Sequence, residues 1–135
     1  MIIAVDFDGI LAGNGSEFPK IGLTNYAMVK LIQDLIENKH EVILWTTRNG
    51  EELQAALDWC KAYKLNFCSI NSPAPSNAAA YEGAYPTQSR KVYADIYLDD
   101  HNPTYMVNYR KFGQVYAIHS MIQQVKEILS WEEEN

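Results

Sequence analysis

The sequence predicts an α/β protein with a mainly parallel sheet of five strands. Five short apolar runs rich in Val, Ile, Tyr or Phe are typical of buried strands, and they occupy residues 2–7, 42–47, 65–70, 94–100 and 114–120. Longer stretches with apolar residues at helical spacing follow the first, second and last of these runs. Strands that alternate with helices form βαβ units, and the strands of such units run parallel.

Three amphipathic helices are expected, at residues 24–40, 49–63 and 120–131. Thr24 is a suitable N-cap for the first of them. In the second, Asn49 is followed three residues later by Glu52, which resembles a capping box. The sequence therefore supplies start signals for two of the three helices.

Two segments do not fit the alternation of strands and helices. Residues 12–22 are rich in glycine and contain a proline, which predicts an irregular turn or a small flap. Residues 71–90 are about twenty small, polar and proline residues, and a loop of that length is usually functional or disordered. Tyr81 and Tyr85 in this loop are suited to stacking on a sugar or a base, although chance placement explains them equally well.

Length and composition limit the classes of function. The 135 residues and 47% hydrophobic content suit a single domain that spans residues 1–135. We expect a soluble, cytoplasmic protein, because no window approaches the roughly 20 apolar residues of a membrane span. The net charge of −6 disfavours a broad nucleic-acid-binding surface but allows a local site for a small anion.

Polar residues gather at the ends of the predicted strands, where open parallel sheets bind their ligands. They are Asp6 and Asp8 after the first strand, Thr46, Thr47 and Arg48 at and after the second, Lys91 before the fourth, and Asp99 and Asp100 at its end. Each group alone has an ordinary explanation as a turn, a cap or an exposed loop. All of them at one edge of one sheet indicate a site.

The charges of these residues point to a metal and a phosphoryl group. Carboxylates that converge at strand ends repel one another by several kcal/mol at an effective dielectric of about 20, unless a cation lies among them. Ligand sets made only of oxygen suit Mg²⁺, which also binds substrate phosphate oxygens. Lys91 and the Thr46 hydroxyl would then hold the phosphate, and Arg48 would reach a second anionic group or pair with a surface acid.

The series DFDGIL, WTTR, a lysine and YLDD resembles the four signature motifs of the haloacid dehalogenase (HAD) superfamily, in their usual order. The resemblance spans residues 3 to about 102. It implies a Rossmann-like three-layer α/β/α sandwich and a phosphatase that forms a phosphoaspartate on Asp6. It makes Asp8 the general acid and base, and Thr46 and Lys91 the phosphate-binding residues, with Thr47 and Arg48 beside them.

The same resemblance implies a Mg²⁺ site formed by Asp6, Asp8, Asp99 and Asp100, in which Asp8 contributes its backbone carbonyl. Which member of the final acidic pair binds the metal directly stays open. The two insertions are too short for a folded cap domain, so the chain resembles capless members of the superfamily. The phosphorylated substrate is then a small molecule or a macromolecule, and the sequence does not fix the oligomeric state.

Two alternatives belong to other functional classes. A HAD-like protein that binds a phosphorylated ligand or partner with little catalysis would carry the same residues. A phospho-receiver domain has a similar length, sheet and residue set, but its acidic doublet comes after the first strand and its lysine comes last. Here Asp6 and Asp8 come first and Lys91 precedes Asp99, an order that disfavours the receiver.

Overall fold

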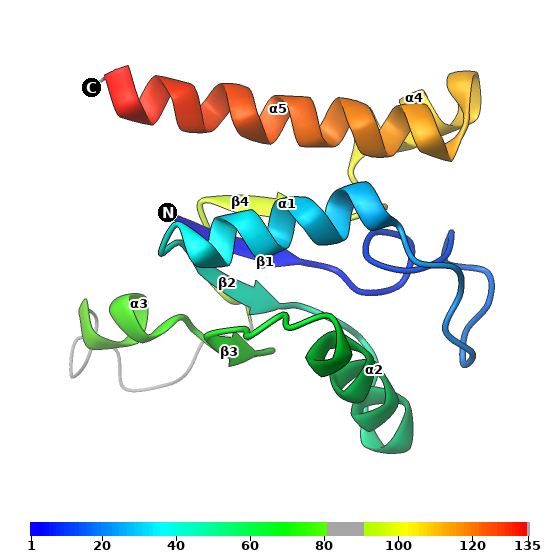
Figure 1. Ribbon diagram of the computed structural model, residues 1–135, viewed down its shortest axis with the longest axis horizontal. Coiled ribbons are helices and arrows are strands. Elements are labelled where there is room, and N and C mark those ends of the chain that lie inside the picture. Colours follow the sequence, from blue (N-terminus) through cyan, green and yellow to red (C-terminus); the bar gives the residue numbers. More distant parts are fainter. Residues whose placement is uncertain (81–90, 135) are drawn as a thin grey trace.

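The computed structural model describes residues 1–80 and 91–134. Four strands form one parallel sheet in the order β3-β2-β1-β4 (Figure 1). The strands are β1 (Ile2–Val5), β2 (Glu41–Leu44), β3 (Ser69–Ile70) and β4 (Ile96–Leu98). The helices are α1 (Tyr26–Glu37), α2 (Gly50–Ala62), α3 (Pro75–Ala80), α4 (Pro103–Phe112) and α5 (Gln114–Glu134). The predicted α/β class and parallel sheet are thus confirmed.

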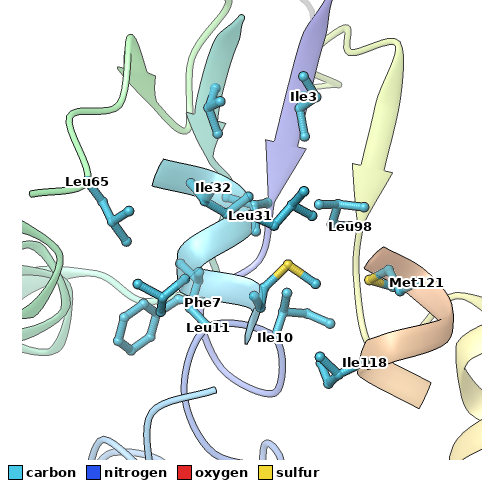
Figure 2. Close-up of a cluster of buried hydrophobic side chains, with 14 of the residues drawn as sticks. Ile3, Phe7, Ile10, Leu11, Leu31, Ile32, Leu65, Leu98, Ile118 and Met121 are labelled. Carbon is cyan, nitrogen blue, oxygen red and sulfur yellow. The ribbon is translucent and has the colours of Figure 1, made fainter. Parts of the chain in front are cut away.

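The central strand β1 is buried on both faces, as its continuous apolar sequence requires. Ile3 and Val5 point to one face and pack in a cluster with side chains of α1, α2 and α5. Figure 2 shows that Ile10 and Leu11, which follow β1, lie in the same cluster as Ile118 of α5. Each fully buried aliphatic side chain of this kind contributes about 1.5–3 kcal/mol to folding.

The opposite face of the sheet has a smaller apolar cluster. Ile2 and Ala4 of β1 lie there with Ile43 of β2, and they pack against Ala74, which precedes α3, and against Ala94, which precedes β4. The helices α1, α2 and α5 therefore cover one face, and the described ends of the connection between β3 and β4, at Ala74 and Ala94, pack on the other. Right-handed crossovers produce this arrangement when a later strand, here β4, is added on the other side of the first strand.

The prediction of a fifth strand was wrong. Residues 114–120 begin α5, a helix of 21 residues that lies beside α1 (Figure 1). In this helix Ile118, Met121, Ile122 and Val125 are buried and Val115 is exposed. The buried positions recur at intervals of three and four, a helical period that the seven-residue window 114–120 is too short to reveal.

The helix α4 was not predicted, although its start signals are present. Asn102 caps it by accepting from the backbone N–H groups of Thr104 (3.0 Å) and Tyr105 (3.4 Å), and Pro103 occupies its first position. Gly113, with a φ of 87°, ends α4 and turns the chain into α5. The start signals, Asn102 and Pro103, follow closely after the acidic doublet, and the sequence analysis assigned no element to them.

The first two helices begin close to the predicted positions but with different caps. Asn25, not Thr24, precedes α1, and its side chain donates to the backbone carbonyls of Ile10 and Gly13. Asn49 precedes α2 as predicted, but its side chain makes no capping hydrogen bond. The capping box of the sequence prediction is therefore absent from α2.

The long segment 71–90 is described only in part. Its first half contains the short helix α3, which the sequence analysis did not predict. Tyr81 and Tyr85 lie outside the described residues, so the proposed stacking role of these two tyrosines stays untested. Among the described residues, no helix is both long and apolar enough to cross a membrane.

A pair of alanine substitutions tests which residues at the start of α5 are buried. Ile118→Ala should lower the free energy of unfolding by about 2–5 kcal/mol, because it leaves a cavity where a side chain only 4% exposed now packs. Val115→Ala should change it by less than about 0.5 kcal/mol, because Val115 is 75% exposed. Urea unfolding followed by circular dichroism measures both, and equal losses would contradict the assignment of these faces.

Candidate functional site

The carboxyl ends of β1 and β4 meet where the strand order reverses. From β1 the chain moves to β2 and then to β3 on one side, whereas β4 pairs with β1 on the other side. Ligands of open parallel sheets bind in the crevice at such a reversal. Asp6 follows β1 and Asp99 follows β4, so the topology brings two of the predicted site residues together.

Three carboxyl groups form a cluster at this point: Asp6, Asp99 and Asp100. The Asp6 backbone N–H donates to the Leu98 carbonyl at 2.9 Å, which sets Asp6 beside the end of β4. Burial of its carboxyl, the charge of Asp99 and a hydrogen bond with Asp100 raise the pKa of Asp6 from 3.8 to about 8. The carboxylate cluster therefore retains a proton near neutral pH unless a cation compensates its charge.

Asp100 lies against the turn after β1, in space that a glycine provides. A Cβ atom at Gly9 would lie 2.4 Å from Asp100 Oδ2, and Gly9 has a φ of 87°, which L side chains rarely adopt. Asp100 Oδ1 is buried and has no hydrogen-bond partner among the described residues. Burial also raises the pKa of the Asp100 carboxyl. An unsatisfied buried oxygen of this kind is explained by a bound water or a bound ion.

His101 stands at the exposed side of the cluster. Its Nδ1 atom lies 3.6 Å from Asp99 Oδ1 and 3.5 Å from Asp100 Oδ1. Each of these three residues offers one ligand atom, and the three atoms lie within 4.8 Å of one another. The geometry is therefore compatible with a bound cation, with the carboxylates as less exposed ligands than His101.

Asp8 lies in a second part of the site and forms a bidentate ion pair with Arg48. Arg48 Nε donates to Asp8 Oδ2 at 2.7 Å, and Arg48 Nη2 donates to Asp8 Oδ1 at 2.8 Å. The Arg48 side chain is completely buried, whereas that of Asp8 is 22% exposed. Such a two-pronged contact fixes the plane of the carboxylate as well as its position.

The prediction that Arg48 binds substrate is not supported by these contacts. Its Nη1 group donates to the carbonyls of Pro19 (3.1 Å) and Glu52 (3.2 Å), and its Nη2 group also donates to the carbonyl of Lys20 (3.2 Å). Together with the two bonds to Asp8, these contacts use all five N–H donors of a guanidinium. In this arrangement Arg48 has no donor left for a ligand, and its acid partner is Asp8, a residue of the predicted site and not a surface acid.

Thr46 and Thr47 follow β2 on the side of Asp8. The Thr46 hydroxyl accepts from the Arg48 backbone N–H at 3.1 Å, and the Thr46 backbone N–H donates to Asn71 Oδ1 at 2.8 Å. Thr47 is exposed. Asn71 was not predicted as part of this region, and its φ of 51° gives no signal in a single sequence.

Lys91 precedes β4 and lies near its middle residue. The Lys91 Nζ atom is 6.0 Å from the centroid of the Tyr97 ring. Tyr97 pairs in register with Ala4, two residues before Asp6. The predicted role of Lys91 as a phosphate-binding cation stays a prediction.

A flap, residues 13–24, runs beside both parts of the site. Its base is closed by a hydrogen bond from the Gly13 N–H to the Leu23 carbonyl (2.6 Å), and Gln114 of α5 donates to the Gly13 carbonyl at 2.6 Å. At Gly15 a Cβ atom would lie 3.2 Å from Asp100 Oδ2, and further along Pro19 meets Arg48. The flap therefore contacts the carboxylate cluster at one place and the Asp8–Arg48 pair at another.

No family model and no curated protein sequence matches this chain. A solved structure, that of a conserved protein from Bacteroides thetaiotaomicron, is similar to it with a TM-score of 0.64 and 34% sequence identity. The match covers 86% of this chain and 97% of that protein. At this identity, over nearly the full length of the other protein, the likeness extends beyond the fold. The chain belongs to the same protein family as this conserved Bacteroides thetaiotaomicron protein.

Proposed function

We propose that the protein is a Mg²⁺-dependent phosphatase of the HAD superfamily, with a HAD-like fold, that hydrolyses phosphomonoesters through a phosphoaspartate on Asp6. One observation carries the proposal: the partly buried carboxyl of Asp6 lies with two further carboxyl groups at the point where the strand order reverses. Burial and the neighbouring acids raise the pKa of Asp6 to about 8. Catalytic groups are commonly found among residues whose pKa is shifted in this way.

The donor set of the carboxylate cluster suits Mg²⁺. Asp6, Asp99 and Asp100 offer oxygen ligands, Asp8 offers its backbone carbonyl, and Asp100 Oδ1 is a buried oxygen that lacks a hydrogen-bond partner among the described residues. When bound, the ion would offset the charge of the carboxylates and of a substrate phosphate. The same ion would let Asp6 lose its proton and so become a nucleophile at neutral pH.

The chemistry then falls on two aspartates. An Asp6 carboxylate oxygen attacks phosphorus, the bond from phosphorus to the leaving oxygen breaks, and Asp8 supplies a proton to that oxygen. In the second step Asp8 takes a proton from a water molecule, which attacks the phosphoaspartate and releases inorganic phosphate. Thr46 and Lys91 would hold the phosphate oxygens during both steps.

A phospholigand-binding protein with little catalysis is the second candidate, and the Asp8–Arg48 pair favours it. Both Asp8 oxygens accept from the guanidinium, which is the arrangement of an ionised carboxylate. Protonation of either oxygen weakens the hydrogen bond that this oxygen accepts, so acid catalysis has a cost here. A panel of phosphomonoesters assayed with Mg²⁺ and with EDTA separates the two candidates.

The metal site predicts a stabilisation that depends on Asp100. Millimolar Mg²⁺ should raise the midpoint of thermal unfolding, because an ion present at 100 times its Kd stabilises the folded state by about 2.7 kcal/mol. Asp100→Asn should lose most of this response. His101→Gln is the comparison and should lose less of the response, because Mg²⁺ prefers carboxylate oxygens to an imidazole nitrogen. An unchanged midpoint in wild-type protein, with activity that survives EDTA, would contradict the metal site.

The pKa of Asp6 predicts a dependence of stability on pH in the absence of metal. Because the pKa of Asp6 is about 8 in the folded state and near 3.8 when unfolded, the folded state holds the proton between these values. The proton held by Asp6 therefore stabilises the folded state fully below about pH 4, and this stabilisation is lost as the pH rises through 8.

Asp6→Asn removes this titration and tests it directly. In EDTA the variant should become more stable relative to wild type as the pH rises from 5 to 8.5. The difference between the thermal unfolding midpoints of the two proteins should grow by several degrees over this range, since about 1 kcal/mol corresponds to roughly 4 °C. Turnover should be abolished, because an amide cannot form the acyl phosphate. Asp58→Asn on the exposed side of α2 is the control, and a difference independent of pH would count against the pKa of Asp6.

Asp8→Asn should separate chemistry from stability. In this variant, turnover of alkyl phosphates should fall by about 10²–10⁴-fold through loss of the general acid. The variant should hydrolyse 4-nitrophenyl phosphate faster than it hydrolyses alkyl phosphates, because the nitrophenolate leaving group needs no proton. The variant also deprives buried Arg48 of its countercharge, so the free energy of unfolding should fall by up to about 3–5 kcal/mol. Assays are therefore run well below the measured midpoint, and wild-type rates on alkyl phosphates would exclude Asp8 as the acid.

A further inference from the structure

Arg48 joins Asp8 to the flap, and both of these lie 28 to 40 positions before it in the sequence. The guanidinium binds Asp8, which follows β1, and the backbone carbonyls of Pro19 and Lys20, which belong to the flap. The guanidinium also donates to a third carbonyl, that of Glu52 in the first turn of α2, which lies four residues after Arg48. One rigid, planar group therefore fixes the relative position of Asp8 and the flap.

Two aromatic rings hold the guanidinium in place. The Arg48 Cζ atom lies 5.1 Å from the ring centroid of Phe7 and 5.1 Å from that of Phe18. Phe7 is fully buried and packs edge-on against Trp59, whereas Phe18 belongs to the flap and is 55% exposed. The ring from the flap thus adds a cation–π contact to the two carbonyl bonds.

The charge balance of this contact depends on Asp8. A fully buried guanidinium requires a countercharge, and among the described residues Asp8 is the acid that forms an ion pair with it. The flap supplies only neutral acceptors. Movement of the flap would take two hydrogen bonds from the guanidinium and expose it to water, which weakens its hold on the Asp8 carboxylate.

We propose that Arg48 is a positioning residue that couples Asp8 to the flap, so that Asp8 keeps its orientation toward the leaving group only while Pro19 and Lys20 are held by the same guanidinium. The kinetic part of this proposal rests on the phosphatase reaction proposed above. Arg48 itself does not touch the substrate. It acts through the carboxylate that transfers the proton and through the segment that borders the site.

Arg48→Lys tests the kinetic part, because an ammonium group keeps the charge but cannot reach Asp8 and three carbonyls together. Two substrates of similar size are compared. The nitrophenolate released from 4-nitrophenyl phosphate needs no proton, whereas the alkoxide released from benzyl phosphate does. The variant should lose at least about tenfold more kcat on benzyl phosphate than on 4-nitrophenyl phosphate, because only the first reaction depends on the acid. Arg110→Lys makes the same substitution at an exposed arginine and should leave both rates unchanged.

Double substitution shows whether Arg48 acts through Asp8. In an Asp8→Asn background, Arg48→Lys should no longer change the ratio of the two rates, because residues that work through one another are not additive. An unchanged ratio in the single Arg48→Lys variant, or a full further change in the double variant, would overturn the kinetic part.

Hydrogen exchange tests the coupling without any assay of activity. Peptides covering the flap, residues 13–24, should exchange several times faster in Arg48→Lys and in Asp8→Asn than in wild type, while peptides from α1 should not change. Flap exchange that is unchanged in both variants would overturn the coupling. If the wild-type protein hydrolyses neither substrate, the proposed function fails, and the exchange experiment alone decides the coupling.

Phe18→Leu provides the test should Arg48→Lys fail to fold. This substitution removes the ring from the flap side of Arg48 but leaves all five hydrogen bonds of the guanidinium possible. It should speed flap exchange and shift the ratio of the two rates in the same direction by a smaller factor. If both exchange and ratio match those of wild type, the flap does not act through Arg48 and the proposal is wrong.

Discussion

The pairing of β1 with β4 is the constraint on which the candidate site depends. The hydrogen bond from the Asp6 N–H to the Leu98 carbonyl continues the ladder of these two strands by one residue beyond β1. Both strands run in the same direction and end at the same level, so the side chains that follow them have to share one small region. A shift of register by one residue would turn Asp6 to the other face of the sheet.

Bringing these carboxyl groups together destabilises the folded state through charge repulsion and desolvation, and burial of the apolar core offsets this effect. The cluster of Asp6, Asp99 and Asp100 is brought together by the backbone pairing of β1 with β4, and within it Asp6 and Asp100 share a hydrogen bond. Asp8 faces the opposite situation, since a buried guanidinium satisfies both of its oxygens. Two aspartates separated by a single residue therefore occupy environments of opposite character, which is how one short motif can serve two chemical roles.

The sequence predicted the parts of the molecule that depend on local pattern. Four of the five expected strands overlap observed strands, although the third is reduced to Ser69–Ile70, and the three expected helices lie within or around α1, α2 and α5. Residues 114–120 were read as a strand because a short apolar run rich in Val, Ile and Tyr fits either structure, and the deciding residues, Met121, Ile122 and Val125, lay beyond it. The partner of Arg48 could not be predicted from the sequence either, because Asp8 is forty positions away and a second anionic group was an equally suitable partner.

The space beside Gly9 has a consequence for how related sequences can vary. Asp100 fills the volume that any larger side chain at position 9 would need, and the backbone there has a conformation that favours glycine. The two positions are therefore tied by volume: a relative with another residue at position 9 would have to move or shorten the acid at position 100. A change at either position would therefore alter which residues the other position can accept, although about ninety residues separate them along the chain.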